Sequence, residues 1–469
     1  MSFLIALASL AFLMFVAYRG FSVILFAPIA ALGAVLLTDP GAVPAAFTSL
    51  FMDKMVGFAK SYFPVFLLGA VFGKVIELSG FSKSIVAAVI NVVGAERAML
   101  AIVLVCAVLT YGGVSLFVVV FAAYPFAAEM FRAGNIPKRL IPGTIALGAF
   151  TFTMDSLPFS PQIQNIIPTT YFNTTNGAAP ILGVIGSIFI FVIGMMYLEW
   201  RRRTARAAGE GYGEGHSNEP EAVDTKELAP AFIAFLPLIV VFVVNLVLGG
   251  FPGLFHGLID RFYGETYDLT LSMAKPITTK VASIKAIWAV MGGLIAGIVT
   301  VFIFAFPKLK STFADGSKAA VAGALLASMN TAAEYGFGGV IAALPGFTVI
   351  KNALSAIPNP LINEAITVTV LAGITGSASG GMSIALAAMA DDFIAAAQAA
   401  NIPLEVLHRV ASMASGGMDT LPHNGAVITL LAVTGLTHRQ SYKDIFAITV
   451  LKTSAVFFVI AVYYATGLV

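Results

Sequence analysis

Charged residues and cysteine are both scarce in this chain of 469 residues. Cys106 is the single cysteine, which excludes a disulfide framework and a cysteine-based metal site. Lysine, arginine, aspartate and glutamate together make up 11% of the residues, whereas soluble domains carry about 25%. The net charge is only +2, so no strong overall field attracts a nucleic acid partner. The composition therefore argues against both a secreted disulfide-rich protein and an ordinary soluble one.

The sequence motifs of common enzymes are also missing. There is no P-loop pattern, which argues against ATP-driven transport by this chain, and no His-Glu-x-x-His metal motif. The Gly-x-Gly strings lie within apolar runs and lack the strand and helix that flank a dinucleotide site. We therefore expect no enzymatic activity, no bound metal and no cofactor.

Long apolar runs are abundant, and 59% of the residues are hydrophobic. Runs of about 20 apolar residues recur along the whole length, which is typical of an all-α polytopic membrane protein with about 11 to 13 membrane-spanning segments. The first run, residues 2–17, lacks a basic region before it and is followed at once by a second run. We interpret it as a retained helix rather than a signal peptide.

Three landmarks occur twice in the same order, which predicts an internal duplication. A glycine-broken apolar run comes first, with its glycines at 112–113 and again at 376–381. Asn-Ile-Pro follows at 135–137 and 401–403, and then Asp-Ser-Leu-Pro at 155–158 and Asp-Thr-Leu-Pro at 419–422. We expect an N-terminal half at residues 1–200, a cytoplasmic linker at 201–228 and a C-terminal half at 229–469, each half holding one repeat.

Each repeat is expected to contain a re-entrant hairpin followed by a broken helix. Residues 98–128 are long for one span and short for two, and residues 361–395 are similar, so a hairpin that turns at the glycines fits both. For residues 98–128, the alternative is one long tilted helix with a glycine packing patch. Residues 140–175 and 404–436 contain the aspartate motifs, and their prolines predict broken helices that line a protein-enclosed cavity. For the first of these segments, the alternative is a surface loop.

Basic residues give the expected orientation of the repeats. The Arg201–Arg203 cluster and the basic loop at Asn135 should be cytoplasmic by the positive-inside rule. The loop at Asn401 has no basic residue before Arg409, which places it on the outside. The two repeats would then be inverted across the membrane, as in many secondary transporters.

A substrate site is expected between the two halves, at the hairpin tips and the helix breaks. Half-helix N-termini present free N–H groups and a positive dipole end, which suit a carboxylate, while hydroxyl and amide groups suit a hydroxy acid. The candidate substrate-binding residues are Gly112, Gly113, Ser115, Ser156, Asn165, Ser377, Ser379, Gly380, Thr420 and Asn424.

Four ionisable residues lie deep in these motifs: Asp155, Asp419, His423 and Glu334. Burial disfavours the charged form of a carboxyl group, so such a group carries a proton readily, and histidine titrates near physiological pH. We therefore favour proton coupling through these residues. The alternatives are helix N-caps for the two aspartates, an interfacial histidine, and a buried structural pair for the glutamate.

The segment from Tyr111 to Asn165, and the stretch from Gly376 to the Asp-Thr-Leu-Pro-His-Asn-Gly string that begins at Asp419, resemble the gluconate permease family of proton-coupled carriers. The resemblance extends along the whole chain. It implies uptake of a small hydroxy-carboxylate with protons across the bacterial inner membrane. Through the wider ion-transporter group, it also implies a homodimer with a mobile transport domain that works as an elevator.

Two features qualify the expected substrate and coupling ion. Phe150, Phe152 and Phe159 surround the first aspartate motif and suggest a substrate smaller than gluconate, such as 3-hydroxybutyrate, whose permeases resemble this family. Carbonyl and hydroxyl oxygens at the hairpin tips would also suit sodium. A sodium-coupled di- or tricarboxylate carrier is therefore the alternative, and an anion channel is a weaker one.

Overall fold

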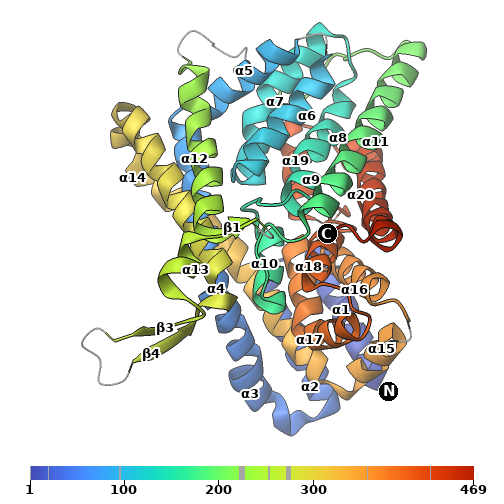
Figure 1. Cartoon of the computed structure of the whole chain (residues 1–469). Coiled ribbons are helices and arrows are strands. Elements are labelled where there is room, and N and C mark those ends of the chain that lie inside the picture. The colour runs from blue at the N-terminus through green and yellow to red at the C-terminus, as the bar shows by residue number, and fades with distance from the viewer. Residues whose placement is uncertain are drawn as a thin grey trace.

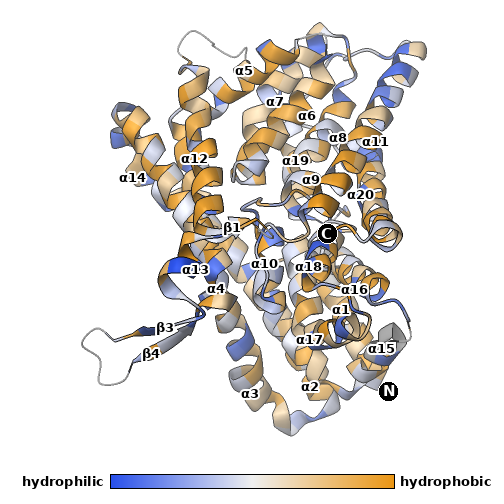
Figure 2. Ribbon diagram, viewed as in Figure 1, coloured by the Kyte–Doolittle hydropathy of each residue, from blue (hydrophilic) through white to orange (hydrophobic). Residues whose placement is uncertain are grey.

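The computed structural model describes residues 2–19, 21–94, 97–220, 228–251, 254–270, 276–355, 357–422 and 424–469. Helices dominate this part of the chain (Figure 1). Among the described residues, six helices are long and apolar enough to cross a membrane, and Figure 2 shows that hydrophobic residues predominate along them. The protein is therefore an all-α polytopic membrane protein, as the composition predicted.

The helices of the first part of the chain are α1 (Ser2–Tyr18), α2 (Val23–Thr38), α3 (Val43–Ala46), α4 (Met52–Leu78), α5 (Phe81–Val93), α6 (Ala98–Tyr111), α7 (Leu116–Ala133), α8 (Ile141–Ala149), α9 (Phe152–Asp155), α10 (Ile163–Phe172) and α11 (Pro180–Ala207). The later helices are α12 (Ala231–Gly249), α13 (Leu258–Tyr263), α14 (Lys285–Ala343), α15 (Pro345–Ser355), α16 (Pro360–Thr375), α17 (Ala378–Ala399), α18 (Leu404–Ser415), α19 (Gly425–Thr434) and α20 (His438–Thr466). Two short antiparallel pairs, β1 (Gly250–Phe251) with β2 (Phe255–His256) and β3 (Thr266–Leu269) with β4 (Ile277–Lys280), separate α12 from α14.

Both glycine-broken runs form helical hairpins. Helices α6 and α7 meet at residues 112–115, and α16 and α17 meet at residues 376–377. Gly113 (φ 93°) and Gly376 (φ 65°) have left-handed backbone conformations, which glycine adopts without strain and which end the first helix of each hairpin. The alternative of one long tilted helix for residues 98–128 is therefore wrong. In Figure 1 the α6–α7 hairpin lies in the upper half of the molecule and the α16–α17 hairpin in the lower half.

Both aspartate motifs lie in breaks between half-helices. The first break separates α8 from α10 and contains the single turn of α9, while the second separates α18 from α19. Pro158, Pro161 and Pro422 lie in these breaks and cannot continue a helix. Ser156 and Ser160 in the first break are fully buried, so the surface-loop interpretation of this segment is wrong.

The backbone repeats the same details in the two halves. Asn135 (φ 47°) and Asn401 (φ 54°), which follow the two hairpins, both adopt the left-handed conformation. Helices α10 and α19 also end at left-handed residues, Asn173 and Gly435. The corresponding hairpins lie in opposite halves of the molecule (Figure 1), as the predicted inverted arrangement of the repeats requires.

Helix α14 folds back on itself between the two repeats. The backbone of Ala305 leaves the helical conformation, and Pro307 follows it. The rings of Phe302 and Phe313 are 4.8 Å apart, whereas a straight helix would separate these positions by about 16 Å. After Pro307, Gly316 lies against Leu78 at the end of α4 and Gly339 against Lys54 near its beginning, so the chain returns antiparallel to α4.

The segment after α11 is more ordered than a flexible linker. Arg201 to Ala207, expected to begin the linker, are helical because Arg202 and Arg203 pair with Glu199 one turn earlier. Residues 208–220, which we call the strap, then pack across the first repeat's basic loop and the end of α19. Residues 221–227 of the expected linker lie outside the described residues.

Candidate functional site

One lysine joins the two helix breaks. Lys452 of α20 is 2% exposed and forms an ion pair with Asp419 in the second break. Its Nζ also donates a hydrogen bond, at 3.1 Å, to the carbonyl oxygen of Phe150 at the end of α8. This carbonyl is one of the groups that a helix C-terminus leaves without a helical partner. The ammonium group of Lys452 thus contacts both breaks in the interior of the protein.

The carboxylate of Asp155 faces the second break from the first. It packs so closely on Gly416 that even a Cβ at this glycine would overlap Oδ2 of Asp155. Lys452, Asp419 and Arg409 are the charged groups that act on it. Two acidic and two basic side chains therefore form one cluster, which we call the central network: Asp155, Asp419, Arg409 and Lys452.

Arg409 holds the loop of the first repeat together. Its guanidinium is fully buried and donates to the carbonyl oxygens of Ala178, at 2.7 and 3.2 Å, and Asp155, at 3.2 Å, and to Oδ1 of Asn165 at 3.0 Å. In the sequence, Arg409 is the first basic residue after the Asn401 loop. The structure instead places it inside α18, where carbonyl oxygens satisfy a charge that would be costly if left unpaired.

Asn165 is fully buried, and each of its polar atoms has a partner. Its Nδ2 donates to the carbonyl oxygens of Asn176, at 2.7 Å, and Ser160, at 3.1 Å. Besides Arg409, its Oδ1 lies 3.4 Å from Nε2 of His408. Asn165 thus shapes the loop from which the first half of the site is built.

Three other predicted binding residues also form protein contacts at the breaks. The Ser156 hydroxyl donates to the Gly183 carbonyl at 3.0 Å, and the hydroxyls of Thr420 and Thr449 lie 2.6 Å apart. Asn424 caps α19, because its Oδ1 accepts from the Val427 N–H at 2.9 Å. Its Nδ2 donates to the Gly376 carbonyl at 2.7 Å and so ties the second break to the second hairpin tip.

The interpretation of the two aspartates as helix N-caps is wrong. Asp155 is the last residue of α9, and Asn424 rather than Asp419 caps α19. The break after Asp419 is longer than the cap pattern assumed, so the next half-helix begins beyond the proline. Both carboxylates are therefore free of a capping role and belong to the central network.

The remaining residues of the second hairpin gather around Glu334. Ser377 caps α17 by accepting from the Gly380 N–H at 3.0 Å, and the Ser379 hydroxyl lies 3.2 Å from that of Thr331. Glu334 packs on Gly380, where a Cβ would overlap its carboxylate. His423, the fourth proton-coupling candidate, lies outside the described residues.

The first hairpin tip packs against α12 and the first break. A Cβ on Gly112 would collide with the Leu238 side chain, and one on Gly113 would lie 3.1 Å from Pro161. Ser115 begins α7 beside Gly73 of α4. The glycines therefore permit a close approach of the tip to its neighbours.

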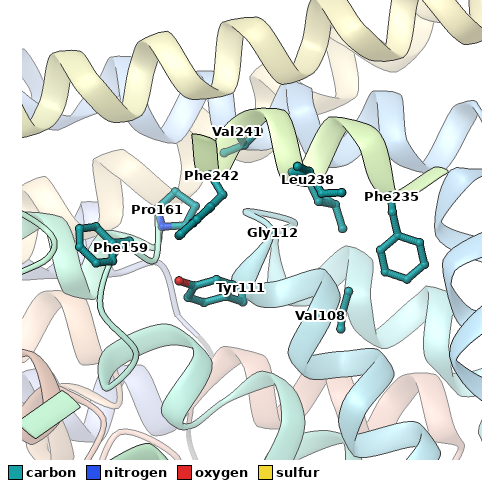
Figure 3. A pocket seen from close by; sticks show the side chains of 10 residues that line it. Val108, Tyr111, Gly112, Phe159, Pro161, Phe235, Leu238, Val241 and Phe242 are labelled. Atoms are coloured by element: carbon teal, nitrogen blue, oxygen red, sulfur yellow. The ribbon is translucent and has the colours of Figure 1, made fainter. Parts of the chain in front are cut away.

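A cavity of about 310 Å³ opens beside this tip (Figure 3). Its walls are almost wholly apolar, and the Tyr111 hydroxyl donates to the Pro158 carbonyl at 2.9 Å. The lining residues come from the end of α6, the first break and α12: Val108, Tyr111, Gly112, Phe159, Pro161, Phe235, Leu238, Ile239, Val241 and Phe242. Of the predicted binding residues, only Gly112 lines this cavity, and the charges of the central network lie outside its walls.

Lys452, His408 and Arg409 are site residues of the structure that were not among those predicted from the sequence. Lys452 carried a usable signal, because a charged residue inside a terminal apolar span is expensive and commonly functional. His408 and Arg409 lie in a short segment with several polar residues, where nothing local distinguishes a buried face from a loop.

Comparisons with known proteins agree with this architecture. The family profile described as GntP family permease matches residues 55–256. The chain is 57% identical over 479 residues to the "Uncharacterized transporter YxjC" of Bacillus subtilis (strain 168), covering all of both chains. The crystal structure of the Alcanivorax borkumensis YdaH transporter, reported to have an unusual topology, matches 92% of this chain and 90% of its own with a TM-score of 0.50. At 16% identity that likeness concerns the fold alone. This chain belongs to the GntP family of permeases and is a multi-pass transporter of the bacterial inner membrane, not an enzyme.

Proposed function

We propose that this permease imports a small hydroxy-carboxylate together with protons. The observation that carries the proposal is the position of Lys452, a buried ammonium group at the point where two broken helices meet. An intramembrane cation paired with a carboxylate marks a substrate or ion pathway in many membrane proteins. A substrate carboxylate could replace Asp419 as the partner of Lys452 when Asp419 takes up a proton.

Helix geometry supports an anionic substrate. Helices α7, α10, α17 and α19 each begin at a hairpin tip or a break, so four half-helix N-termini are directed toward the interior. Each N-terminus presents the positive end of the helix dipole and the N–H groups of its first turn, of which Ser377 and Asn424 already cap one each in α17 and α19. Discontinuous helices in other transporters bind substrate carboxylates in this way.

The apolar cavity supports a short substrate. Phe159 and Phe242 reduce its width, and Tyr111 supplies a hydroxyl group at its edge (Figure 3). A four-carbon hydroxy acid such as 3-hydroxybutyrate combines a carboxylate with a mostly apolar body and fits such walls better than a polyhydroxylated acid does. We therefore favour a short hydroxy acid over gluconate.

Proton uptake by buried acidic residues and a histidine would be coupled to substrate transport, and part of each protomer would move across the membrane. Asp155, Asp419, His423 and Glu334 are the proposed proton carriers. Two copies of the chain would form a homodimeric elevator, and the hairpins and broken helices of the halves at residues 1–200 and 229–469 would belong to the moving part of each copy. The end that carries Arg201 and the strap would face the cytoplasm. Hydroxyl oxygens around Ser377 and Ser379 favour a sodium-coupled carboxylate carrier as the second candidate.

Uptake by purified protein in liposomes tests the proposal. Labelled 3-hydroxybutyrate should accumulate when the outside is acidic, and an uncoupler should abolish the accumulation. Gluconate, lactate, citrate and succinate serve as competitors, with sodium or choline as the salt. Accumulation that ignores the proton gradient but requires sodium would favour the second candidate, and lack of uptake of every hydroxy acid would reject the proposed substrate class.

A further inference from the structure

Glu334 differs from the acidic residues of the central network. It lies on α14, is 3% exposed and faces the beginning of α17. Within the described residues, its Oε2 is buried and has no hydrogen-bond partner. Asp419, by contrast, pairs with Lys452. A buried carboxylate oxygen without a partner is strongly disfavoured in the charged form, so this group favours a bound cation or a proton.

The surroundings of Glu334 are rich in oxygen atoms. The position that a Cβ of Gly380 would occupy touches the Glu334 carboxylate and lies 2.9 Å from the Ser377 hydroxyl. One turn away, the Thr331 and Ser379 hydroxyls lie 3.2 Å apart. Oδ1 of Asn330, four residues before Glu334 on the same helix, is also buried and lacks a hydrogen-bond partner in the described structure. Carboxylate, hydroxyl and amide oxygens are the ligands that hard cations prefer.

The charged groups around α14 leave this carboxylate uncompensated. Tyr335, the next residue, bonds to Tyr171 of α10, and Lys54 of α4 packs on Gly339 one turn further along. Burial and the Ser377 hydroxyl are the influences that act on Glu334, and in the described part of the chain no lysine, arginine or histidine is among them. The site therefore has one negative charge available for a cation.

We propose that Glu334, together with the hydroxyls of Thr331, Ser377 and Ser379, forms a binding site for one monovalent cation, separate from the central network. The cation is a proton or a sodium ion, since both neutralise a buried carboxylate. Its occupancy would stabilise the α16–α17 tip against α14, and Asn424 would transmit this order to the second break through Gly376. As the coupling-ion site of the transporter, it rests on the proposed function, but cation binding itself does not.

Thermal unfolding of the detergent-purified full chain tests the site without a substrate. At pH 8 in choline chloride, stepwise replacement of choline by sodium at constant ionic strength should raise the Tm if the site takes sodium. Acidification from pH 8 to pH 6 in choline should raise it if the site takes a proton. Glu334→Gln, which preserves the shape of the side chain, should abolish whichever response the unmodified protein shows.

Two further variants make the test specific. Thr331→Val removes a hydroxyl ligand, so it should raise the apparent Kd for sodium about tenfold or more while leaving a proton response in place. Glu364→Gln removes another fully buried carboxyl group, on α16, whose two oxygens also lack a hydrogen-bond partner among the described residues. It tests whether burial alone explains the response, which this variant should retain. An unmodified protein insensitive to both ions, an unaltered response in Glu334→Gln, or equal loss in Glu364→Gln would overturn the proposal.

The outcome separates this site from the proposed function. If the unmodified protein takes up no hydroxy acid but Glu334→Gln still abolishes its Tm response, the substrate proposal fails and the cation site stands. If uptake occurs and Glu334→Gln keeps gradient-driven accumulation, the proposed function stands and the site is not the coupling site. In the expected result, Glu334→Gln exchanges substrate across the membrane but no longer accumulates it.

Discussion

Lys452 and Asp419 form an ion pair inside the membrane-spanning body of the protein. The same ammonium group donates to the Phe150 carbonyl at 3.1 Å, so a single side chain connects the breaks of both repeats. A movement of one break must therefore either disrupt these contacts or carry the other break with it. This makes Lys452 the first residue to test.

Replacing Lys452 by Met should destabilise the protein by about 3 kcal/mol, the lower end of the range for a buried pair, because it leaves the Asp419 carboxylate, whose side chain is 14% exposed, without its partner. Uptake of substrate should be lost as well. The double variant Lys452→Met/Asp419→Asn should recover most of the stability but not the uptake, and Lys452→Arg serves as the charge-preserving control. Thermal unfolding and liposome uptake measure the two effects. Full uptake by the double variant would show that the pair is only structural.

Replacing Phe242 by Ala should shift substrate preference toward larger acids, because its ring forms part of the cavity wall beside Tyr111 (Figure 3). Loss of this ring should improve competition by gluconate relative to 3-hydroxybutyrate about tenfold, since a size difference of a few methylene groups in an apolar pocket changes selectivity by this order. Phe232→Ala is the matched control on the same helix, because Phe232 is 71% exposed and lies outside the cavity. An equal shift in substrate preference in the two variants would show that the cavity does not determine substrate selection.

Gly148→Ala should cost about 1 to 3 kcal/mol, because the new methyl group would overlap the Val103 carbonyl oxygen and the Cys106 side chain. This glycine lets α8 approach α6 behind the first break. Gly33→Ala in α2 is the control, since no atom lies within 4 Å of its added methyl, and it should be neutral or slightly stabilising. Thermal unfolding of both variants gives the comparison. A neutral Gly148→Ala would mean that these helices do not pack as described.

The strap should detach at acidic pH. Burial alone raises the pKa of Glu219, but hydrogen bonds from Lys138, Arg132 and Tyr212 outweigh it and hold this pKa below its usual value. A lowered pKa stabilises the attached state above the ordinary pKa of glutamate, about 4.3, and this stabilisation is lost as the pH falls through the lowered value. Glu219→Gln should mimic the acidic state at pH 7.

Hydrogen–deuterium exchange of residues 208–220 measures this release. Exchange at pH 7 should be faster in Glu219→Gln than in the unmodified protein, because Lys138 and Arg132 lose their partner. Glu214→Gln is the control, since Glu214 is an exposed neighbour in the same strap. Equal protection of the strap in all three proteins would show that other contacts, such as the Ser217 bond to Gly435 at 2.9 Å, are sufficient.

The hairpins and breaks could be predicted because their signals are local. Glycines in the middle of an apolar run, and prolines beside an aspartate, limit the backbone whatever surrounds them. The duplication supplied a second, independent copy of each signal, and Asn135 and Asn401 confirm it through their shared left-handed backbone. Inversion followed from basic residues near one loop and not the other.

The central network could not be predicted, because it depends on contacts between segments far apart in the chain. Phe150 and Lys452 are 302 residues apart, and no local sequence pattern indicates that they are in contact. The N-cap interpretation of Asp419 failed for a related reason. It assumed that a helix follows at once, whereas tertiary packing places the helix start at Asn424. Substrate-binding and coupling roles remain predictions for the experiments above.

Arg409 has a consequence for how the protein is made. Its guanidinium donates hydrogen bonds to the carbonyl oxygens of Ala178 and Asp155. However, Arg409 is synthesised 231 residues after Ala178. A nascent chain that holds only the first repeat therefore exposes an unsatisfied polar loop to lipid until α18 is inserted. We therefore expect that the first repeat does not fold alone and that a chain truncated before α18 is unstable.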